Sequence, residues 1–156
     1  MSVERETDRR AFFLTAGVGA AALLSVTRAD AADWTETERA NVKAVTEFCA
    51  AWSTRDITRA LPYLSDDCVY RMTETTAPAN GHAGVSDRLK TFVENSERVE
   101  FKVLESFAAG PIVINRRVDR FVSTRPLTWE GVGVFFVKDG KIKEWSDYTI
   151  RSSRSA

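Results

Sequence analysis

The spacing of apolar residues along the chain predicts helices in its first half. Between residues 37 and 53, apolar side chains recur three or four positions apart, directly after the capping-box pattern Thr35-x-x-Glu38. A short second helix is predicted over residues 56–64. A third is predicted over residues 85–95, where four apolar positions share one face. These positions are Val85, Leu89, Phe92 and Val93.

The second half of the chain predicts strands instead. An early strand over residues 68–72 is followed by a loop over residues 73–84 with one proline and two glycines. Between the last two strands, Asp139-Gly140 is typical of a two-residue hairpin turn. Helices first and strands afterwards predict an α+β fold, in which three helices pack on one face of a curved antiparallel sheet and enclose a pocket. The four longer strands are predicted over residues 99–108, 112–123, 128–138 and 141–150.

Composition narrows the chemistry that such a pocket can hold. Lys and Arg total 22, and Asp and Glu also total 22, so the chain is neutral and does not favour nucleic acid as a partner. His82 is the single histidine, and Cys49 and Cys68 lack the spacing of a zinc site. Gly131-Val132-Gly133 is only a fragment of a phosphate-binding pattern and lies inside a predicted strand. We therefore expect no metal and no cofactor.

The N-terminal segment differs from the rest of the chain. Arg9 and Arg10 precede an uncharged run, residues 11–26, that is shorter than the ~20 apolar residues of a membrane-spanning helix. Ala29-Asp30-Ala31 then supplies a cleavage pattern. The segment resembles a bacterial twin-arginine export signal, which predicts a periplasmic or secreted protein with no membrane span after cleavage. The predicted organisation is a signal over residues 1–31, a linker over 32–36, one domain over 37–151 and a tail over 152–156.

The predicted strand over residues 112–123 carries more charge than a buried strand usually does. Because successive side chains of a strand point to opposite faces, Asn115, Arg117 and Asp119 share one face. The strand predicted over residues 128–138 lies between two turns. If the turn before it spans the four residues 124–127 and the turn after it spans Asp139-Gly140, the two turns fix which residues it pairs with on the neighbouring strands. The rows expected on this face are Asp119, Val132 and Asp147, and beside them Arg117, Val134 and Trp145.

This arrangement would place Arg117 diagonally between Asp119 and Asp147 in an apolar setting. Two carboxyl groups that share one arginine can hold different protonation states, one ionised as a base and one protonated as an acid. Acid–base chemistry near neutral pH requires that division. The register does not assign the two roles, and a salt-bridge cluster on an exposed sheet face is the alternative interpretation.

Several short motifs occur together in the chain: Arg117-Val-Asp119, Asp139-Gly-Lys-Ile142 and Trp145-Ser-Asp-Tyr148, with Tyr70 on the first strand. Together they resemble the limonene-1,2-epoxide hydrolase family, which lies within the nuclear-transport-factor-2-like (SnoaL-like) superfamily of cone-shaped α+β folds. The resemblance covers residues 41–150. It implies a cofactor-independent hydrolase that adds water to a small lipophilic epoxide in one step, and a homodimer as a common assembly.

The resemblance also implies roles for individual side chains. Asp147 would deprotonate a water molecule, and Asp119 would protonate the epoxide oxygen. Arg117 would bridge the two acids, and Tyr70 would help to hold the water.

One position departs from the family pattern. The family has Tyr-x-Asn on the first strand, whereas this chain has Met72, and a thioether cannot hold water as an amide does. Asn115 is the hypothetical replacement, and Met72 would instead widen an apolar pocket. Two other interpretations stay open: an isomerase or lyase that resembles ketosteroid isomerases or polyketide cyclases, and a non-catalytic binder of a small apolar ligand. The expected pocket wall comprises Met72, Asn115, Val132, Val134 and Trp145.

Overall fold

The computed structural model describes residues 34–154, in which two α-helices and three short 3-10 helices accompany one sheet. The export signal predicted for residues 1–31 lies outside the described residues. None of the helices in the described part of the chain is long and apolar enough to cross a membrane.

The first helix starts where its capping box predicts. α1 spans Glu36–Ala51, and the Thr35 hydroxyl accepts a hydrogen bond from Glu38 N while the Glu38 carboxylate accepts one from Thr35 N. The predicted second helix is instead a pair of 3-10 helices, η3 (Ile57–Arg59) and η4 (Leu61–Tyr63), because Pro62 has no N–H with which to continue an α-helix. A third 3-10 helix, η2 (Trp52–Thr54), directly follows α1. α2 spans Gly81–Glu94 and starts earlier than predicted.

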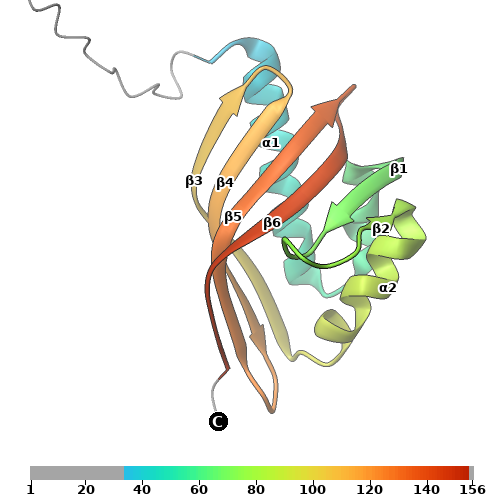
Figure 1. Ribbon diagram of the computed structural model, residues 1–156, viewed down its shortest axis with the longest axis vertical. Coiled ribbons are helices and arrows are strands. Elements are labelled where there is room, and N and C mark those ends of the chain that lie inside the picture. Colours follow the sequence, from blue (N-terminus) through green and yellow to red (C-terminus); the bar gives the residue numbers. More distant parts are fainter. Residues whose placement is uncertain (1–33, 155–156) are drawn as a thin grey trace, which may run out of the picture.

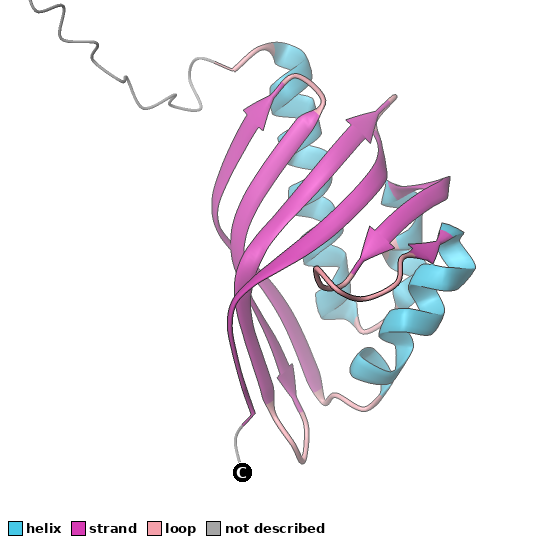
Figure 2. Ribbon diagram, in the orientation of Figure 1, coloured by secondary structure: helices cyan, strands magenta, loops and turns pink. Residues whose placement is uncertain are grey.

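Six strands form one strongly curved sheet in the order β2-β1-β6-β5-β4-β3. α1 lies across one face of the long strands, and α2 lies beside β1 and β2 (Figures 1 and 2). The predicted α+β architecture, with helices on one face of a curved sheet, is confirmed. The strands are β1 (Leu64–Arg71), β2 (Ala79–Asn80), β3 (Arg98–Ala109), β4 (Ile112–Val122), β5 (Leu127–Lys138) and β6 (Lys141–Arg154).

Two features of the sheet differ from the prediction. The sheet is mixed rather than antiparallel throughout, because β1 runs parallel to β6. A parallel pair needs a long connection, and α2 with four further strands separates β1 from β6 along the chain. β6 also continues to Arg154, past the predicted strand end at residue 150.

The pairing of β4 with β5 is shifted from the predicted register. Phe121 lies opposite Leu127, so the connection is one residue longer and placed earlier than the four-residue loop assumed. Asp119 therefore lies opposite Trp129, and the predicted pairing of Asp119 with Val132 is wrong.

The pairing of β5 with β6 starts as predicted and then shifts by one residue. Asp139 and Gly140 have φ of 51° and 72°, and Lys138 lies opposite Lys141, so the two-residue turn is confirmed. Beyond the turn, Lys143 is an extra residue in β6 that has no partner in β5. The shift places Asp147 opposite Gly133 instead of Val132.

The core lies between the helices and the sheet and is rich in aromatic rings. Phe48 of α1 is fully buried, and its ring meets four others at centroid distances of 5.0 to 6.5 Å. Such edge-to-face contacts stabilise a core beyond simple burial. The four rings belong to Trp52, Tyr63, Phe135 and Trp145. Phe48 thus joins α1 to the strands that carry the polar residues described below.

Replacing Phe48 with alanine is expected to lower the free energy of unfolding by about 3–5 kcal/mol, because the site loses ring contacts and gains a cavity. Urea denaturation followed by circular dichroism would measure the loss. Phe107 is 45% exposed on the outer face of β3, so Phe107→Ala is the matched control and should cost less than about 1 kcal/mol. Equal losses in the two variants would contradict the central place of Phe48.

Candidate active site

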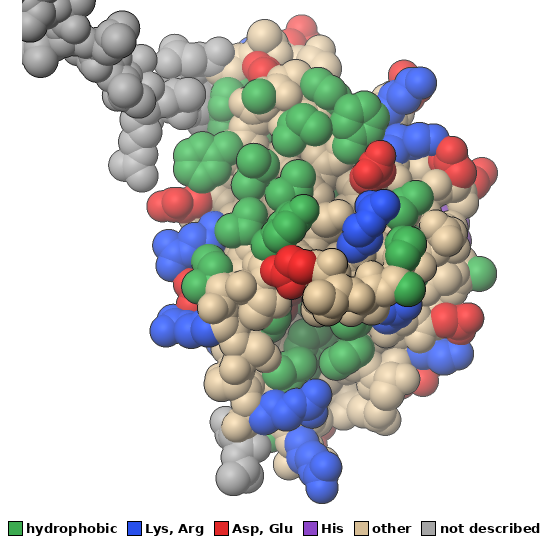
Figure 3. Space-filling model, in the orientation of Figure 1, with side chains coloured by type: hydrophobic (Ala, Val, Ile, Leu, Met, Phe, Trp, Pro, Cys, Tyr) green, Lys and Arg blue, Asp and Glu red, His purple; other side chains and the backbone are tan. Residues whose placement is uncertain are grey.

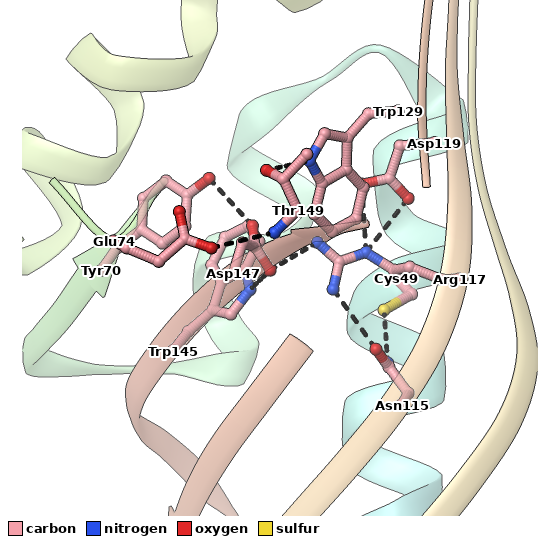
Figure 4. A network of polar contacts seen from close by, with 10 residues as sticks. All are labelled: Cys49, Tyr70, Glu74, Asn115, Arg117, Asp119, Trp129, Trp145, Asp147 and Thr149. Atoms are coloured by element: carbon pink, nitrogen blue, oxygen red, sulfur yellow. Dashed lines mark hydrogen bonds and ion pairs between the residues drawn. The ribbon is translucent and has the colours of Figure 1, made fainter. Parts of the chain in front are cut away.

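Three charged side chains meet on the helix-facing side of the sheet (Figure 4). Arg117 of β4 donates from Nε to both oxygens of Asp119, at 3.0 and 3.1 Å, and from Nη2 to Asp147 Oδ1 at 2.7 Å. All three residues are buried, and Arg117 is only 1% exposed. The structure therefore brings together the two acids with the arginine between them, and the group is not an exposed salt-bridge cluster.

Asp147 accepts more hydrogen bonds than Asp119 does. Trp145 Nε1 donates to Asp147 Oδ1 at 2.7 Å, and the Tyr70 hydroxyl donates to Oδ2 at 3.2 Å. The Tyr70 ring stacks on Trp145 with centroids 3.9 Å apart, which holds the phenol in place. With Arg117, Asp147 has three donors, and each of them favours the ionised carboxylate. Among residues 34–154, Asp119 accepts side-chain bonds only from Arg117.

Arg117 reaches Asp147 by crossing β5 at a place where the strand has no side chains. Gly131 lies opposite Arg117, and Gly133 lies opposite Asp147 on the other side. A Cβ atom on Gly133 would overlap Arg117 Nη1, and one on Gly131 would overlap the Trp129 ring. Glycine inside a strand often marks a place where another group approaches the backbone closely. The Gly131-x-Gly133 pattern could therefore have indicated this crossing, although it was interpreted only as a fragment of a phosphate-binding pattern.

Val132 and Val134, predicted beside the acids, lie on the opposite face of β5. Val132 pairs with Arg116 on β4 and Tyr148 on β6, which both point to the outer face. The predicted pocket positions of the two valines are therefore wrong. The β4–β5 and the β5–β6 pairings each differ from the predicted register by an odd number of residues. Each shift alone turns side chains to the other face, so β5 presents the opposite face from the one predicted, while the two shifts together leave β4 and β6 with matching faces. Asp119 and Asp147 consequently share a face, as predicted, although the faces of β5 between them are the reverse of the prediction.

Three aromatic rings surround the Arg117 guanidinium. Its Cζ atom lies 4.8 Å from the ring centroid of Trp129, 5.4 Å from Phe101 and 5.6 Å from Trp145. Such contacts stabilise a buried cation. Trp129 is held in turn by a 2.9 Å bond from its Nε1 to Thr149 Oγ1. Sequence reasoning missed Trp129 because the assumed register did not place it opposite Asp119.

Asn115 lies behind Arg117 rather than in the pocket. Its Oδ1 accepts a bond from Arg117 Nη1 at 3.3 Å, and its Nδ2 lies 3.5 Å from Cys49 Sγ. Because Asn115 is fully buried and held on both sides, it positions the arginine and does not replace the amide missing at Met72. Burial raises the pKa of the Cys49 thiol to about 12, so this neighbour stays neutral.

The two acids open into a pocket of about 330 Å³. Tyr70, Asp119 and Asp147 form its polar end, with Arg117 and Trp145 behind them. Figure 3 shows hydrophobic side chains inside a hollow in the lower half of this face. The apolar wall consists of Met72, Leu89, Phe92, Phe101, Phe121, Leu127 and Trp129. A pocket of this kind suits a small lipophilic molecule that carries one polar, reactive group.

Burial changes the protonation of the two acids. It raises the pKa of both carboxyl groups, although Arg117 opposes the change, and the pKa of Asp119 reaches about 7. Burial lowers the pKa of Arg117, but the two acids outweigh it and keep the guanidinium charged. Two carboxylates and one guanidinium carry a net charge of −1, so one proton on the pair makes the buried group neutral. The Tyr70 phenol also stays protonated, because burial and the charge of Asp147 raise its pKa.

Among residues 34–154, no group of three or more His, Cys, Asp or Glu side chains is placed to hold a metal ion. The two buried carboxyl groups can supply proton transfer. Asp147, with three donors, is the acid better held as a carboxylate, and Asp119 is the one more easily protonated.

Gly133→Ala is expected to lower the free energy of unfolding by about 1–3 kcal/mol, because the new methyl group overlaps Arg117. Urea denaturation would measure the change. Gly84→Ala in α2 is the comparison and should cost less than Gly133→Ala, since its methyl group would lie 3.3 Å from the backbone of Ala79, a tight contact rather than an overlap. Wild-type stability in Gly133→Ala would show that the arginine does not need this space.

The stability of the protein should fall as pH rises from about 4 to about 7. In this window the folded protein keeps a proton that the unfolded chain has lost, because the pKa of Asp119 rises from 3.8 to about 7 on folding. Asp119→Asn should flatten that fall by up to about 1.4 kcal/mol per pH unit, as measured by urea denaturation across the window. Asp87→Asn, an exposed acid on α2, should leave the slope unchanged. Identical slopes in wild type and Asp119→Asn would overturn the raised pKa.

Comparison with solved structures identifies the fold and, in one case, a similarity in sequence as well. An LEH-like epoxide hydrolase from M. tuberculosis is 27% identical over 72% of this chain and 84% of that chain, with a TM-score of 0.61. A candidate SnoaL-like polyketide cyclase from Jannaschia sp. CCS1 is 15% identical over 76% and 90% of the two chains, with a TM-score of 0.65. An NTF2-like protein from Cytophaga hutchinsonii is 16% identical over 70% and 88%, with a TM-score of 0.58. The last two show the fold alone, and that fold is the predicted nuclear-transport-factor-2-like one.

The sequence itself supplies the family. No curated protein matches the chain. The SnoaL-like domain family matches residues 45–145, which is more than half of the chain and includes Tyr70, Arg117 and Asp119. The protein therefore belongs to the SnoaL-like domain family.

Proposed function

We propose that the protein is a cofactor-independent epoxide hydrolase that adds water to a small lipophilic epoxide. The observation that carries the proposal is the buried Arg117, which donates to Asp119 and Asp147 at the polar end of an apolar pocket. The Arg-Val-Asp motif and the similarity to the M. tuberculosis LEH-like epoxide hydrolase support it. An epoxide needs both a base for the attacking water and an acid for the leaving oxygen, and this pair of carboxyl groups can supply both.

Asp147 is assigned as the general base. Three donors hold it ionised, and it lines the pocket with one side accessible to a water molecule. Tyr70, whose hydroxyl lies 3.2 Å from Asp147 Oδ2, would contact the same water. Because Trp145 and Arg117 fix Asp147 from behind, its orientation does not depend on the water.

Asp119 is assigned as the general acid. It lines the same pocket and has a pKa of about 7, so a large fraction is protonated near neutral pH. Arg117 Nε donates to both oxygens of Asp119, and no other side chain among residues 34–154 donates a hydrogen bond that would favour its ionised form. The division of roles follows from the unequal number of donors on the two acids.

The proposed reaction consumes one water and needs no other reactant. Asp147 takes a proton from the water while the water oxygen attacks an epoxide carbon. The C–O bond of the ring breaks, and the freed oxygen takes the proton of Asp119, which yields a diol. Asp147 is then protonated and Asp119 ionised, and proton exchange with solvent through the pocket restores both starting states.

Met72 lines the pocket and adds to its apolar wall. Its thioether has no N–H or O–H to donate, so it leaves the water with Asp147 and Tyr70 as its proposed contacts. The proposed enzyme is therefore expected to favour apolar substrates.

A proton-transferring isomerase or cyclase is the second candidate. The missing amide at Met72 favours it, because chemistry without a bound water does not need that contact. A buried carboxyl group of raised pKa can take a proton from carbon beside a carbonyl group. Water labelled with a heavy oxygen isotope separates the candidates, since only the hydrolase adds the water oxygen to its product.

Asp147→Asn and Asp119→Asn are each expected to lower kcat/KM for diol formation by about 100- to 10,000-fold, because each removes one proton transfer. A panel of lipophilic epoxides, with diols measured by mass spectrometry, provides the assay. Asp66→Asn, an exposed acid on β1, should keep wild-type activity. Retained activity in folded Asp147→Asn would show that the proposed base is wrong.

A further inference from the structure

The rim of the pocket carries a basic side chain from the end of β6. A second extra residue near Ile150 shifts the β5–β6 pairing, so Trp129 lies opposite Ser152 and Leu127 opposite Arg154. Ser152 and Arg154 thereby turn to the pocket face, and both line the pocket. Figure 3 shows Lys and Arg side chains along the lower edge of the hollow. The last strand thus extends the site beyond the acids.

Arg154 has no side-chain partner among residues 34–154. Its guanidinium makes no hydrogen bond and no ion pair with these residues, and its side chain is exposed. Arg151, three residues earlier on the same strand, points to the outer face and pairs with Glu130 at 2.6 Å. The difference leaves Arg154 free for a ligand, and the planar guanidinium suits a carboxylate.

The charges around the pocket orient a ligand in one direction. Asp119 and Asp147 form the closed end, where a second anionic group would be repelled. Among the described residues that line the pocket, Arg154 alone is basic, and it lies seven residues from Asp147 along β6 and one pocket-facing row beyond Asp119. Glu74, on the loop above the rim, accepts a bond from Thr149 N at 3.2 Å and is thereby held at β6. A ligand with one anionic end would therefore place that end at Arg154 and its other end at the acids.

The distance between the two ends sets the size of the ligand. Asp147 and Arg154 are seven residues apart on β6, one of them the extra residue of the bulge, which separates their backbones by roughly 20 Å. The two side chains lean into the pocket and shorten that gap. The wall between them is apolar, with Leu127, Phe121 and Trp129 nearest the rim. A flexible chain or ring system of about ten carbon atoms fits a pocket of about 330 Å³.

The geometry points to an amphiphilic substrate, in which an apolar segment separates the reactive epoxide from a carboxylate that binds Arg154. This inference rests on the proposed hydrolase for the reacting group, but the preference for a carboxylate at the rim is a property of the pocket alone. It narrows the substrate class from any lipophilic epoxide to long apolar epoxides with an acidic end.

The terminal epoxide of undecenoic acid and its methyl ester test the preference in the full chain. We expect kcat/KM for the acid to exceed that for the ester by roughly five- to tenfold, and added salt should reduce the difference. Arg154→Met should abolish the preference by raising KM for the acid, with the ester unchanged. Arg151→Met is the matched control, since it removes an arginine from the same strand on the other face. Equal rates for acid and ester, or an equal loss of preference in both variants, would overturn the inference.

Binding without turnover separates this inference from the proposed function. Titration calorimetry with undecanoate and with undecanol needs no epoxide chemistry, and undecanoate should bind roughly five- to tenfold more tightly to wild type but not to Arg154→Met. If no epoxide is hydrolysed while this preference is present, the proposed reaction fails and the carboxylate site stands. If undecanoate binds no better than undecanol, the carboxylate site fails, whatever the outcome with epoxides.

Discussion

A guanidinium buried between two carboxyl groups is the interaction on which the rest of the site depends. Removing such charges from water costs several kcal/mol each, and only close, well-formed hydrogen bonds offset that cost. Arg117 meets the requirement with bonds of 2.7 to 3.1 Å to the two acids and with three aromatic rings around its Cζ. Because one positive charge faces two acids, the group becomes neutral only when one acid carries a proton. The electrostatics of burial thus create the acid–base pair that the proposed reaction uses.

The backbone makes this arrangement possible by leaving a gap in the middle of the sheet. Arg117 and Asp147 lie on strands that are not neighbours, and any side chain on the pocket face of β5 at Gly133 would stand between them. The curvature of the sheet then turns the same face toward the helices, where Leu89 and Phe92 of α2 close the apolar wall. The gap and the curvature have different effects, since the gap lets the charged groups meet and the curvature encloses the pocket into which the two acids open.

Structures that share this fold include an LEH-like epoxide hydrolase and a candidate polyketide cyclase, so one fold can accommodate different chemistry. A fold of this kind supplies a pocket, and the side chains that line it decide what the pocket does. In this chain the side chains change in character along the pocket, with two acids at the closed end, an apolar middle and the exposed Arg154 at the rim. Met72 belongs to the apolar middle, which is consistent with selection of a ligand by shape and length.

The sequence alone determined the order of helices and strands, the hairpin at Asp139-Gly140 and the face shared by Asn115, Arg117 and Asp119, because these follow from local spacing and strand alternation. It also indicated that Asp147 would join them, and the prediction survived only because two odd register errors cancelled. Tertiary structure decided which residues stand between the acids: Gly131 and Gly133 rather than Val132 and Val134. It also decided the parallel pairing of β1 with β6, the position of Asn115 behind the arginine, and the turn of Arg154 toward the pocket. Bulges and loop lengths set each of these, and they reflect packing between distant segments that local sequence patterns do not encode.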